Sequence, residues 1–286
     1  MKALNLHAVG DLRYEDVPMP VRQAGEVLLK VHACGICGSD LPRVFTKGTY
    51  HFPTIPGHEY IAVKEWNLVF FDDSLSYEEA AMCEPAAVAL HAIGQASVGI
   101  GDTVAVFGAG PIGIMLGLWA RTAGAFRVIL CDIDPTKVEF ARKQGFDAVN
   151  SRETDPVEYI RTQTGGRGAD ACIEGAGVAQ TWEQALKAVK SFGTVVSMGN
   201  PAGDMTLTQK GYWEILRKQL TLKGTWNSSY NDVRNEWRTA LAAIASHRID
   251  VRPLISHRFP LSEADKAFGV MRERKEFFNK VMFINR

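Results

Sequence analysis

Three short motifs in the first third of the 286-residue chain carry side chains that bind zinc in proteins. CGICGSD contains Cys37, PGHE contains His58, and CEP contains Glu84. Zinc accepts thiolate, imidazole and carboxylate, and a catalytic site uses three such ligands and leaves one position for water or substrate. Asp40 is placed to orient His58 by accepting its other ring N–H. The spacing alone leaves other interpretations open, because a histidine beside a glutamate is also typical of a surface pair.

The cysteines narrow the possible chemistry. Cys34 and Cys37 form C-x-x-C after a predicted strand, which also fits thiol redox chemistry, but Pro42 follows and the βαβ context of such a motif is missing. A four-cysteine zinc site is excluded. Only Cys83, Cys131 and Cys172 remain to complete it, and two of these lie in or beside predicted buried strands. Five cysteines, an odd number, favour reduced thiols and a cytoplasmic protein.

A glycine motif in the middle of the chain predicts dinucleotide binding. The apolar run Thr103 to Phe107 is typical of a buried parallel strand, and Gly108, Gly110 and Gly113 follow it as G-x-G-x-x-G. Gly108 permits a tight turn, Gly110 lets the backbone approach a pyrophosphate, and Gly113 lets the next helix lie close to the strand. Pro111 suits the first position of that helix, whose amino end favours an anion.

An acid at the end of the next strand indicates which dinucleotide binds. Asp132 follows Gly113 at close to the spacing of about 20 residues at which a carboxylate accepts a hydrogen bond from the adenosine ribose. A carboxylate at this position repels a 2′-phosphate, so the motif favours NAD over NADP. Further backbone contacts to the cofactor are expected from Ile112, Gly175 and Gly199, since the last two follow the ends of later strands. Ordinary turn chemistry is the alternative for those two glycines.

Composition bounds the class of protein. The chain has 32 Lys and Arg and 32 Asp and Glu, which gives no electrostatic reason to expect nucleic acid or an anionic membrane as a partner. No stretch approaches 18 uninterrupted apolar residues, and the N-terminus meets charge at once, so neither membrane spanning nor export is expected. A small-molecule substrate is therefore the expected partner.

The elements that must position these residues fall into two groups. Residues 1–66 predict short strands, Lys2 to Leu6, Arg13 to Val17, Glu26 to Cys34 and Tyr60 to Trp66. The S-x-x-E of Ser76 and Glu79 is a capping box that opens a helix, which Pro85 must kink or end. Strands and helices then alternate, which requires a doubly wound parallel α/β sheet. Six strands are expected: Thr103 to Phe107, Arg127 to Cys131, Ala148 to Asn150, Ala171 to Glu174, Thr194 to Met198, and Thr221 to Leu222.

The C-terminal part completes the first group. Helices are expected over 233–247 and 262–272, followed by a strand Lys280 to Ile284. This piece is too small to fold alone, so we expect it to pack on the N-terminal β unit. The expected domains are a β-rich catalytic domain, 1–86 with 225–286, and an NAD-binding domain, 87–224.

The order of these motifs resembles a known family. The chain resembles the zinc-dependent medium-chain dehydrogenases, in particular their polyol (sorbitol-like) branch. The resemblance is carried by CGxCGSD, PGHE, EPxxVxLHA, VxxxGAGPIG and a strand that ends in Asp, and it runs from Met1 to Arg286. SDLPRVF and LRKQLTLKGTWN look most like galactitol-1-phosphate dehydrogenases. The resemblance implies a GroES-like catalytic domain, a Rossmann domain, NAD and a catalytic zinc.

The resemblance also implies roles for single residues. The metal ligands would be Cys37, His58 and a carboxylate, either Glu84 or Glu59. Ser39 matches the hydroxyl that hydrogen-bonds the substrate oxygen and starts proton relay; capping the helix that begins at Asp40 is a compatible second role. Because Pro42 stands where some relatives continue the relay with histidine, solvent or Glu59 would take the proton.

The substrate class follows from the same resemblance. We expect oxidation of a secondary alcohol of a polyol or polyol phosphate, by a homodimer or homotetramer. Arg43 and Lys47 are candidates for holding a substrate phosphate, and a solvated charged face is the alternative. Two rival functions are a zinc-free medium-chain reductase, which the intact Cys37, His58 and Glu84 argue against, and an NAD-binding protein without turnover.

One departure from the family stands out. In the family several dozen residues, including the lobe that holds a structural zinc, separate PGHE from the strand that matches Tyr60 to Trp66. Here Glu59 runs directly into Tyr60, so a structural zinc site is absent. Either the chain has an internal deletion or the printed sequence joins two segments of a longer chain. A deletion would leave sheet edges and apolar surface exposed, which favours the second explanation. A Cα–Cα step of about 3.8 Å at this junction would support continuity.

Overall fold

The computed structural model describes residues 1–56, 65–231 and 233–285. The chain divides into two compact units, residues 1–84 with 237–286, and residues 85–236. Within the described residues no helix is both long and apolar enough to cross a membrane.

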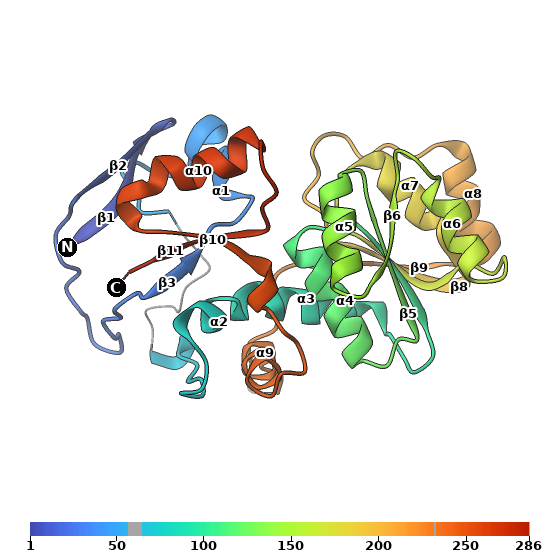
Figure 1. Ribbon diagram of the computed structural model, residues 1–286, viewed down its shortest axis with the longest axis horizontal. Helices are drawn as coiled ribbons and strands as arrows, with labels where there is room; N and C mark the ends of the chain where they lie inside the picture. Colours follow the sequence, from blue (N-terminus) through green and yellow to red (C-terminus); the bar gives the residue numbers. More distant parts are fainter. Residues whose placement is uncertain (57–64, 232, 286) are drawn as a thin grey trace. The chain divides into compact units, whose positions relative to one another are not determined.

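Unit 85–236 contains a six-stranded parallel sheet (Figure 1). Its strand order is β6-β5-β4-β7-β8-β9, and β4 therefore lies at the point where the order reverses direction. Five helices follow strands of this sheet, which makes it doubly wound, as the alternation of elements predicts. The bounds are β4 Thr103–Phe107, α4 Pro111–Thr122, β5 Arg127–Asp132, α5 Pro135–Lys143, β6 Asp147–Asn150, α6 Pro156–Gln163, β7 Ala169–Glu174, α7 Ala179–Ala188, β8 Val189–Ser197, α8 Gln209–Lys218 and β9 Thr221–Gly224.

Apolar strands bury this sheet on both faces. Ala105 and Phe107 of β4, Ile129 of β5 and Cys172 of β7 are each 2% exposed or less. They pack with residues of α6, α7 and β8 in one core cluster. A strand covered on both faces has no polar alternation, which is why β4 and β5 read as continuous apolar runs.

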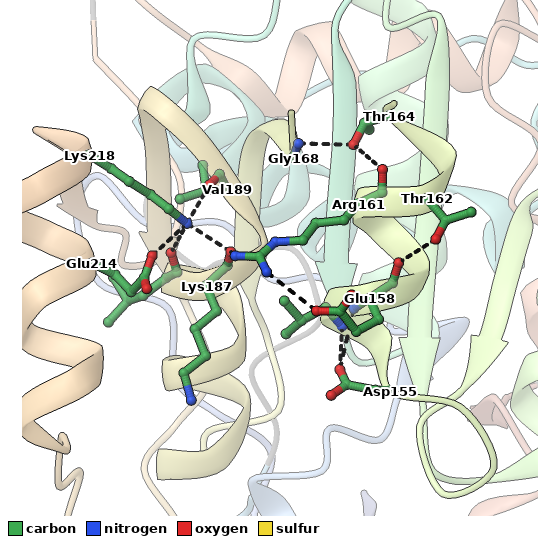
Figure 2. Close-up of polar contacts among 12 residues, drawn as sticks. Asp155, Glu158, Arg161, Thr162, Thr164, Gly168, Lys187, Val189, Glu214 and Lys218 are labelled. Carbon is green, nitrogen blue, oxygen red and sulfur yellow. Dashed lines mark hydrogen bonds and ion pairs between the residues drawn. The ribbon is translucent and has the colours of Figure 1, made fainter. Parts of the chain in front are cut away.

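One cation closes the carboxyl end of α7 (Figure 2). Lys218 of α8 donates from Nζ to the backbone carbonyls of Leu186, Lys187 and Val189 at 3.0, 2.7 and 2.9 Å, and pairs with Glu214 at 2.9 Å. The last carbonyls of a helix have no partner within the helix, and a cation there also complements the helix dipole. Lys218 therefore fixes α7 to α8.

The change Lys218→Met should lower the free energy of unfolding by about 1–3 kcal/mol, because three carbonyls lose a charged donor. Lys143→Met is the matched control, since Lys143 is 70% exposed and makes only a surface pair with Glu139 at 3.7 Å. The control should cost less than about 0.5 kcal/mol. Urea unfolding of both variants measures the difference, and equal losses would contradict the structural role of Lys218.

Unit 1–84 with 237–286 is built on small sheets. β1 pairs antiparallel with β2, and a three-stranded sheet has the order β10-β11-β3. In this sheet the C-terminal β11 lies between β10 and the N-terminal β3, so the two ends of the chain share one sheet, as expected (Figure 1). The bounds are β1 Lys2–Ala8, β2 Asp11–Asp16, β3 Ala33–Gly35, α1 Asp40–Pro42, π-helix η1 Arg43–Lys47, 3-10 helix η2 Glu65–Asn67, α2 Tyr77–Ala81, α9 Glu236–Ala245, 3-10 helix η3 Arg252–Leu254, β10 Ile255–Phe259, 3-10 helix η4 Leu261–Glu263, α10 Ala264–Glu273 and β11 Lys280–Ile284. Helix α3, Cys83–Ala96, begins at the end of this unit, and from Pro85 onward it belongs to unit 85–236.

The core of this unit joins distant segments. Leu6 of β1, Val44 of η1 and Val281 of β11 are fully buried, and Phe268 of α10 packs with them. The capping box of Ser76 and Glu79 is present at α2 as expected. The helix ends at Ala81, and α3 begins anew at Cys83 with Pro85 in its first turn, where a missing N–H is tolerated.

Two of the strands expected from the sequence are wrong in extent. Of the strand expected over Glu26 to Cys34, the described residues form a strand only at Ala33–Gly35, and Glu26 forms an isolated β-bridge. Leu28 and Val31 of this stretch are 57% and 38% exposed despite the apolar alternation. Of the strand expected over Tyr60 to Trp66, residues 60–64 lie outside the described residues, and Glu65–Asn67 is a 3-10 helix. The junction of Glu59 and Tyr60 is likewise outside the described part.

Candidate functional site

The turn between β4 and α4 has the geometry that the glycine motif requires. Gly108 has φ +112°, a backbone conformation that disfavours other residues. A Cβ on Gly113 would lie 2.0 Å from the carbonyl oxygen of Gly108, so only glycine lets the helix start this close to the strand. The turn is therefore specified by sterics at two of its three glycines.

Gly110 differs from its neighbours because space lies beside it. A Cβ on Gly110 would meet no atom within 4 Å. Gly110 is the N-cap of α4, and Pro111 follows at the first helical position with Ile112 next, both half-buried. The amino end of a helix presents N–H groups without intrahelical partners and partial positive charge. Open space in front of these donors is what an approaching pyrophosphate needs.

Asp132 ends β5 next to this turn. Its carboxylate accepts hydrogen bonds from the backbone N–H of Ala109 at 2.8 Å and of Asp134 at 2.9 Å. The side chain is half-buried, so it remains accessible to a ligand. The carboxylate thus lies against the glycine turn, at the place from which it could accept a ribose hydroxyl.

The loops after β7 and β8 close on one another beside the same turn. A Cβ on Gly108 would contact Gly175 at 3.5 Å, and a Cβ on Gly199 would lie 2.2 Å from the amide nitrogen of Gly177. Gly175 is exposed and Gly199 half-buried. These carboxyl ends of β4, β7 and β8 therefore form one rim of backbone, in which Gly175 and Gly199 lie where a cofactor ribose is expected.

Glu174 was missed by the sequence reasoning. This carboxylate is 1% exposed and accepts from the N–H groups of Ala176 and Gly177, both at 2.8 Å, and from the Thr181 hydroxyl at 2.7 Å. The Glu174 carboxylate therefore fixes the loop after β7 by binding its backbone N–H groups. The signal that could have found it is an acid at the end of a buried strand followed by G-x-G.

In the other unit, Cys37 lies on the loop between β3 and α1. Its half-buried sulfur accepts hydrogen bonds from the backbone N–H of Ser39 at 3.5 Å and from Ser39 Oγ at 3.2 Å. Its own N–H donates to the buried Asp40 carboxylate at 2.9 Å. Hydrogen bonds donated to a sulfur favour the thiolate, which is the form that binds metal.

The expected capping role of Ser39 is wrong. Ser39 is the N-cap of α1 by position, but its backbone is helical, with φ −72° and ψ −15°, and its side chain makes no cap hydrogen bond. The hydroxyl turns to Cys37 Sγ instead. Ser39 therefore places a proton-carrying oxygen directly beside an expected metal ligand.

Glu84 lies in the first turn of α3 and is half-buried. It lines an apolar pocket of about 200 Å³ together with His32, Tyr77 and Trp237. His32 stacks on Tyr77 with ring centroids 4.0 Å apart. Cys37 is not among the lining residues, so the pocket does not by itself bring the expected ligands together.

The other expected ligands, His58 and Glu59, lie outside the described residues. Among the residues that are described, no group of three or more His, Cys, Asp or Glu side chains could hold a metal ion. The complete ligand set of Cys37, His58, Glu84 and Glu59 therefore remains a prediction.

Three other cysteines, Cys83, Cys131 and Cys172, are buried thiols. Burial, with a smaller contribution from the neighbouring Glu84, raises the pKa of Cys83 to about 12. Burial also raises the pKa values of Cys131 and Cys172 above the usual range of a thiol. These three thiols are therefore favoured in their neutral form.

A further cavity lies in unit 85–236. A groove of about 910 Å³ runs along α6, α7 and α8, and none of the expected site residues lines it. Two of its cations are already paired, Arg161 with Glu158 at 3.3 Å and Lys187 with Glu183 at 2.6 Å (Figure 2 shows this region). Its size alone is therefore no reason to regard it as the site.

Known proteins resemble this chain over its whole length. The sorbitol dehydrogenase of Bacillus subtilis is 27% identical over 348 aligned positions, which cover 99% of this chain and 96% of that protein. The crystal structure of galactitol-1-phosphate dehydrogenase from Escherichia coli matches with a TM-score of 0.91 and 26% identity over 100% of both chains. A structure from Sinorhizobium meliloti, described as a zinc-binding dehydrogenase bound to NADP, matches with a TM-score of 0.89 and 26% identity over 99% of both chains.

The alignment also shows what this chain lacks. Because it has 348 positions and the chain has 286 residues, at least 62 positions (348 less 286) have no counterpart here. The match covers 99% of this chain, so the missing positions are internal.

Two family models match the two parts of the chain. The model described as "Alcohol dehydrogenase GroES-like domain" matches residues 23–64, and the model described as "Zinc-binding dehydrogenase" matches residues 111–246. The first match lies in the β-rich unit and the second begins at the glycine turn and follows the doubly wound sheet. Together with the polyol dehydrogenase relatives, these matches show that the chain belongs to the zinc-dependent alcohol and polyol dehydrogenase family, with a GroES-like unit and a Rossmann unit.

Proposed function

We propose that this protein oxidises a secondary alcohol of a polyol or polyol phosphate and transfers the hydride to NAD, with one catalytic zinc. The observation that carries the proposal is the contact of Ser39 Oγ with Cys37 Sγ at 3.2 Å, because it joins a proton-carrying hydroxyl to an expected metal ligand. The polyol relatives support the substrate class.

The donor set fits zinc. Cys37 offers a half-buried sulfur that accepts two hydrogen bonds, and a thiolate, an imidazole and a carboxylate are the ligand types of catalytic zinc sites. Cys37, His58 and either Glu84 or Glu59 would hold the ion. When bound, zinc would supply Lewis acidity that lowers the pKa of the substrate hydroxyl.

The chain's own groups would then handle the proton. Ser39 Oγ would accept the hydroxyl proton of the alcohol and pass it on, with solvent or Glu59 as the next acceptor. The buried Asp40 carboxylate positions this loop by accepting the backbone N–H of Cys37. The Cys37 sulfur in turn accepts from Ser39 Oγ, so two hydrogen bonds fix Cys37 relative to Ser39.

The glycine turn would bind the cofactor. The free N–H groups at the start of α4 would bind the pyrophosphate beside Gly110, and Asp132 would accept the adenosine ribose hydroxyl. A carboxylate at this position disfavours a 2′-phosphate, so we propose NAD although one relative is bound to NADP. Cytoplasmic location and a homodimer or homotetramer remain predictions.

The test of this function is NADH formation at 340 nm with a panel of polyols and their phosphates. Turnover that requires zinc and prefers NAD to NADP supports the proposal. Zinc content near zero in protein kept from chelators, with NAD still bound, would refute it.

Ser39→Ala should lower kcat by roughly 10- to 1,000-fold, since it removes one general acid–base group. The KM for NAD should stay within about twofold, because we assign Ser39 to proton transfer and not to cofactor binding. Ser39→Thr keeps the hydroxyl and should restore part of kcat. A kcat that is unchanged in Ser39→Ala would exclude the proposed relay.

A second candidate function is NAD binding without turnover. It is favoured by the internal positions of the relatives that this chain lacks. NAD binding and NADH formation, measured on the same protein, distinguish the two functions. A protein without turnover would bind NAD normally and form no NADH with any alcohol on the panel.

A further inference from the structure

The π-helix η1, Arg43–Lys47, is held firmly against α10. Val44 is fully buried in the core of this unit. The Phe45 ring packs edge-on against Phe268, with centroids 5.6 Å apart, and the guanidinium of Arg272 lies 5.1 Å from the same ring. Short π-helical turns are rare and are often found at functional sites. The segment thus has one face fixed to the core.

The opposite face of η1 presents two cations. Arg43 comes before Val44 and Phe45, Lys47 follows them, and both cations are exposed. They are four residues apart, which is about one turn, so their side chains leave the helix on the same side. Lys47 forms no ion pair with any described residue, whereas Lys266 on the same unit pairs with Glu263 at 3.1 Å.

Arg43 is connected to the Cys37 loop. Its Nη1 lies 3.3 Å from Oδ1 of Asp40, and Oδ2 of the same carboxylate accepts the N–H of Cys37. One buried carboxylate therefore links the guanidinium to the loop that carries the expected metal ligand. The Arg43 side chain is still 48% exposed, so it can reach a ligand in solvent.

We propose that Arg43 and Lys47 bind the phosphate group of a polyol phosphate, which makes the phosphorylated form the substrate; this rests on the proposed function. A guanidinium matches the oxygens of a phosphate in a bidentate geometry, and an ammonium adds a point charge. The phosphate of such a substrate lies several bonds from the carbinol that is oxidised. An anion site near the Cys37 loop, but separate from it, meets this requirement.

Galactitol 1-phosphate and galactitol, titrated into the zinc-loaded protein by calorimetry and compared in steady-state kinetics, test the proposal. The wild type should bind the phosphate ester at least tenfold more tightly than the free polyol. Lys47→Gln should weaken binding of the ester roughly 10- to 100-fold and leave kcat/KM for the free polyol within about twofold. Arg43→Gln should act in the same direction and Arg43→Lys should recover part of the loss. Lys266→Gln is the matched control and should change neither value.

The outcomes separate this proposal from the proposed function. Equal affinity of the wild type for ester and free polyol, or unchanged ester binding in Lys47→Gln, overturns the phosphate site even if the protein turns over polyols. Tight ester binding that depends on Lys47, without NADH formation, supports the phosphate site while the proposed function fails. Lys47→Gln has no hydrogen bond or ion pair to lose among the described residues, so a folding defect does not explain its result.

Discussion

Cys37→Ala is expected to lower turnover by roughly a thousandfold or more while NAD affinity stays within about twofold. A bound metal supplies several kcal/mol of transition-state stabilisation, and this variant removes the thiolate that we assign to the metal. The pyrophosphate and ribose contacts that we propose use the glycine turn and Asp132, which are in the other unit. The measurements are zinc per chain, kcat and NAD affinity by fluorescence quenching.

Cys34→Ala is the matched control for this variant. Cys34 lies three residues earlier, is also half-buried, and its Sγ donates a long hydrogen bond to the Gly35 carbonyl at 3.6 Å. The control should keep its zinc and most of its turnover. If both variants lose zinc and turnover equally, or if Cys37→Ala loses NAD binding as well, the assignment of Cys37 as the metal ligand is contradicted.

Two alanine substitutions in the glycine turn should fail in different ways. In Gly113→Ala the new Cβ would lie 2.0 Å from the carbonyl oxygen of Gly108 and 2.9 Å from its carbon, so α4 must move away from β4. Because these are backbone atoms in a buried turn, the cost should be roughly 3 kcal/mol or more, with loss of NAD binding. Thermal unfolding and NAD titration measure both effects.

Gly110→Ala should weaken cofactor binding without disturbing the fold. The new Cβ meets no protein atom within 4 Å, and the φ of −71° at this position suits alanine. Stability should therefore change by less than about 1 kcal/mol. NAD binding should weaken roughly tenfold or more, since the methyl group occupies the space that the pyrophosphate needs. Normal NAD affinity in Gly110→Ala would show that the cofactor does not approach this turn.

The Rossmann unit could be predicted because its signals are local. Each buried strand is a short apolar run, Gly108 and Gly113 have a steric reason within the turn, and Asp134 caps α5 before Pro135. The expected starts of β6, β7 and β8 are too late, by one residue for β6, whereas the first residues of β7 and β8 pair across a register irregularity. Glu174 was missed because periodicity does not show that a buried acid is satisfied by the backbone of the next loop.

The GroES-like unit was harder to predict because its strands depend on distant partners. β3 pairs with β11 from the far end of the chain, and the residues just before it stay out of a ladder despite their apolar alternation. Ser39 illustrates the same limit for the site, since a serine before a helix predicts a cap, and only its side-chain direction shows that it donates to Cys37.

The most direct test of the central claim is NADH formation from a polyol or its phosphate as zinc is removed by a chelator and then restored. The account predicts one catalytic zinc per chain, NADH formation that falls in proportion to zinc, and full recovery when zinc returns, while NAD affinity stays constant. NADH formation that persists in zinc-free protein, or zinc-loaded protein that binds NAD and oxidises no member of the panel, would contradict it.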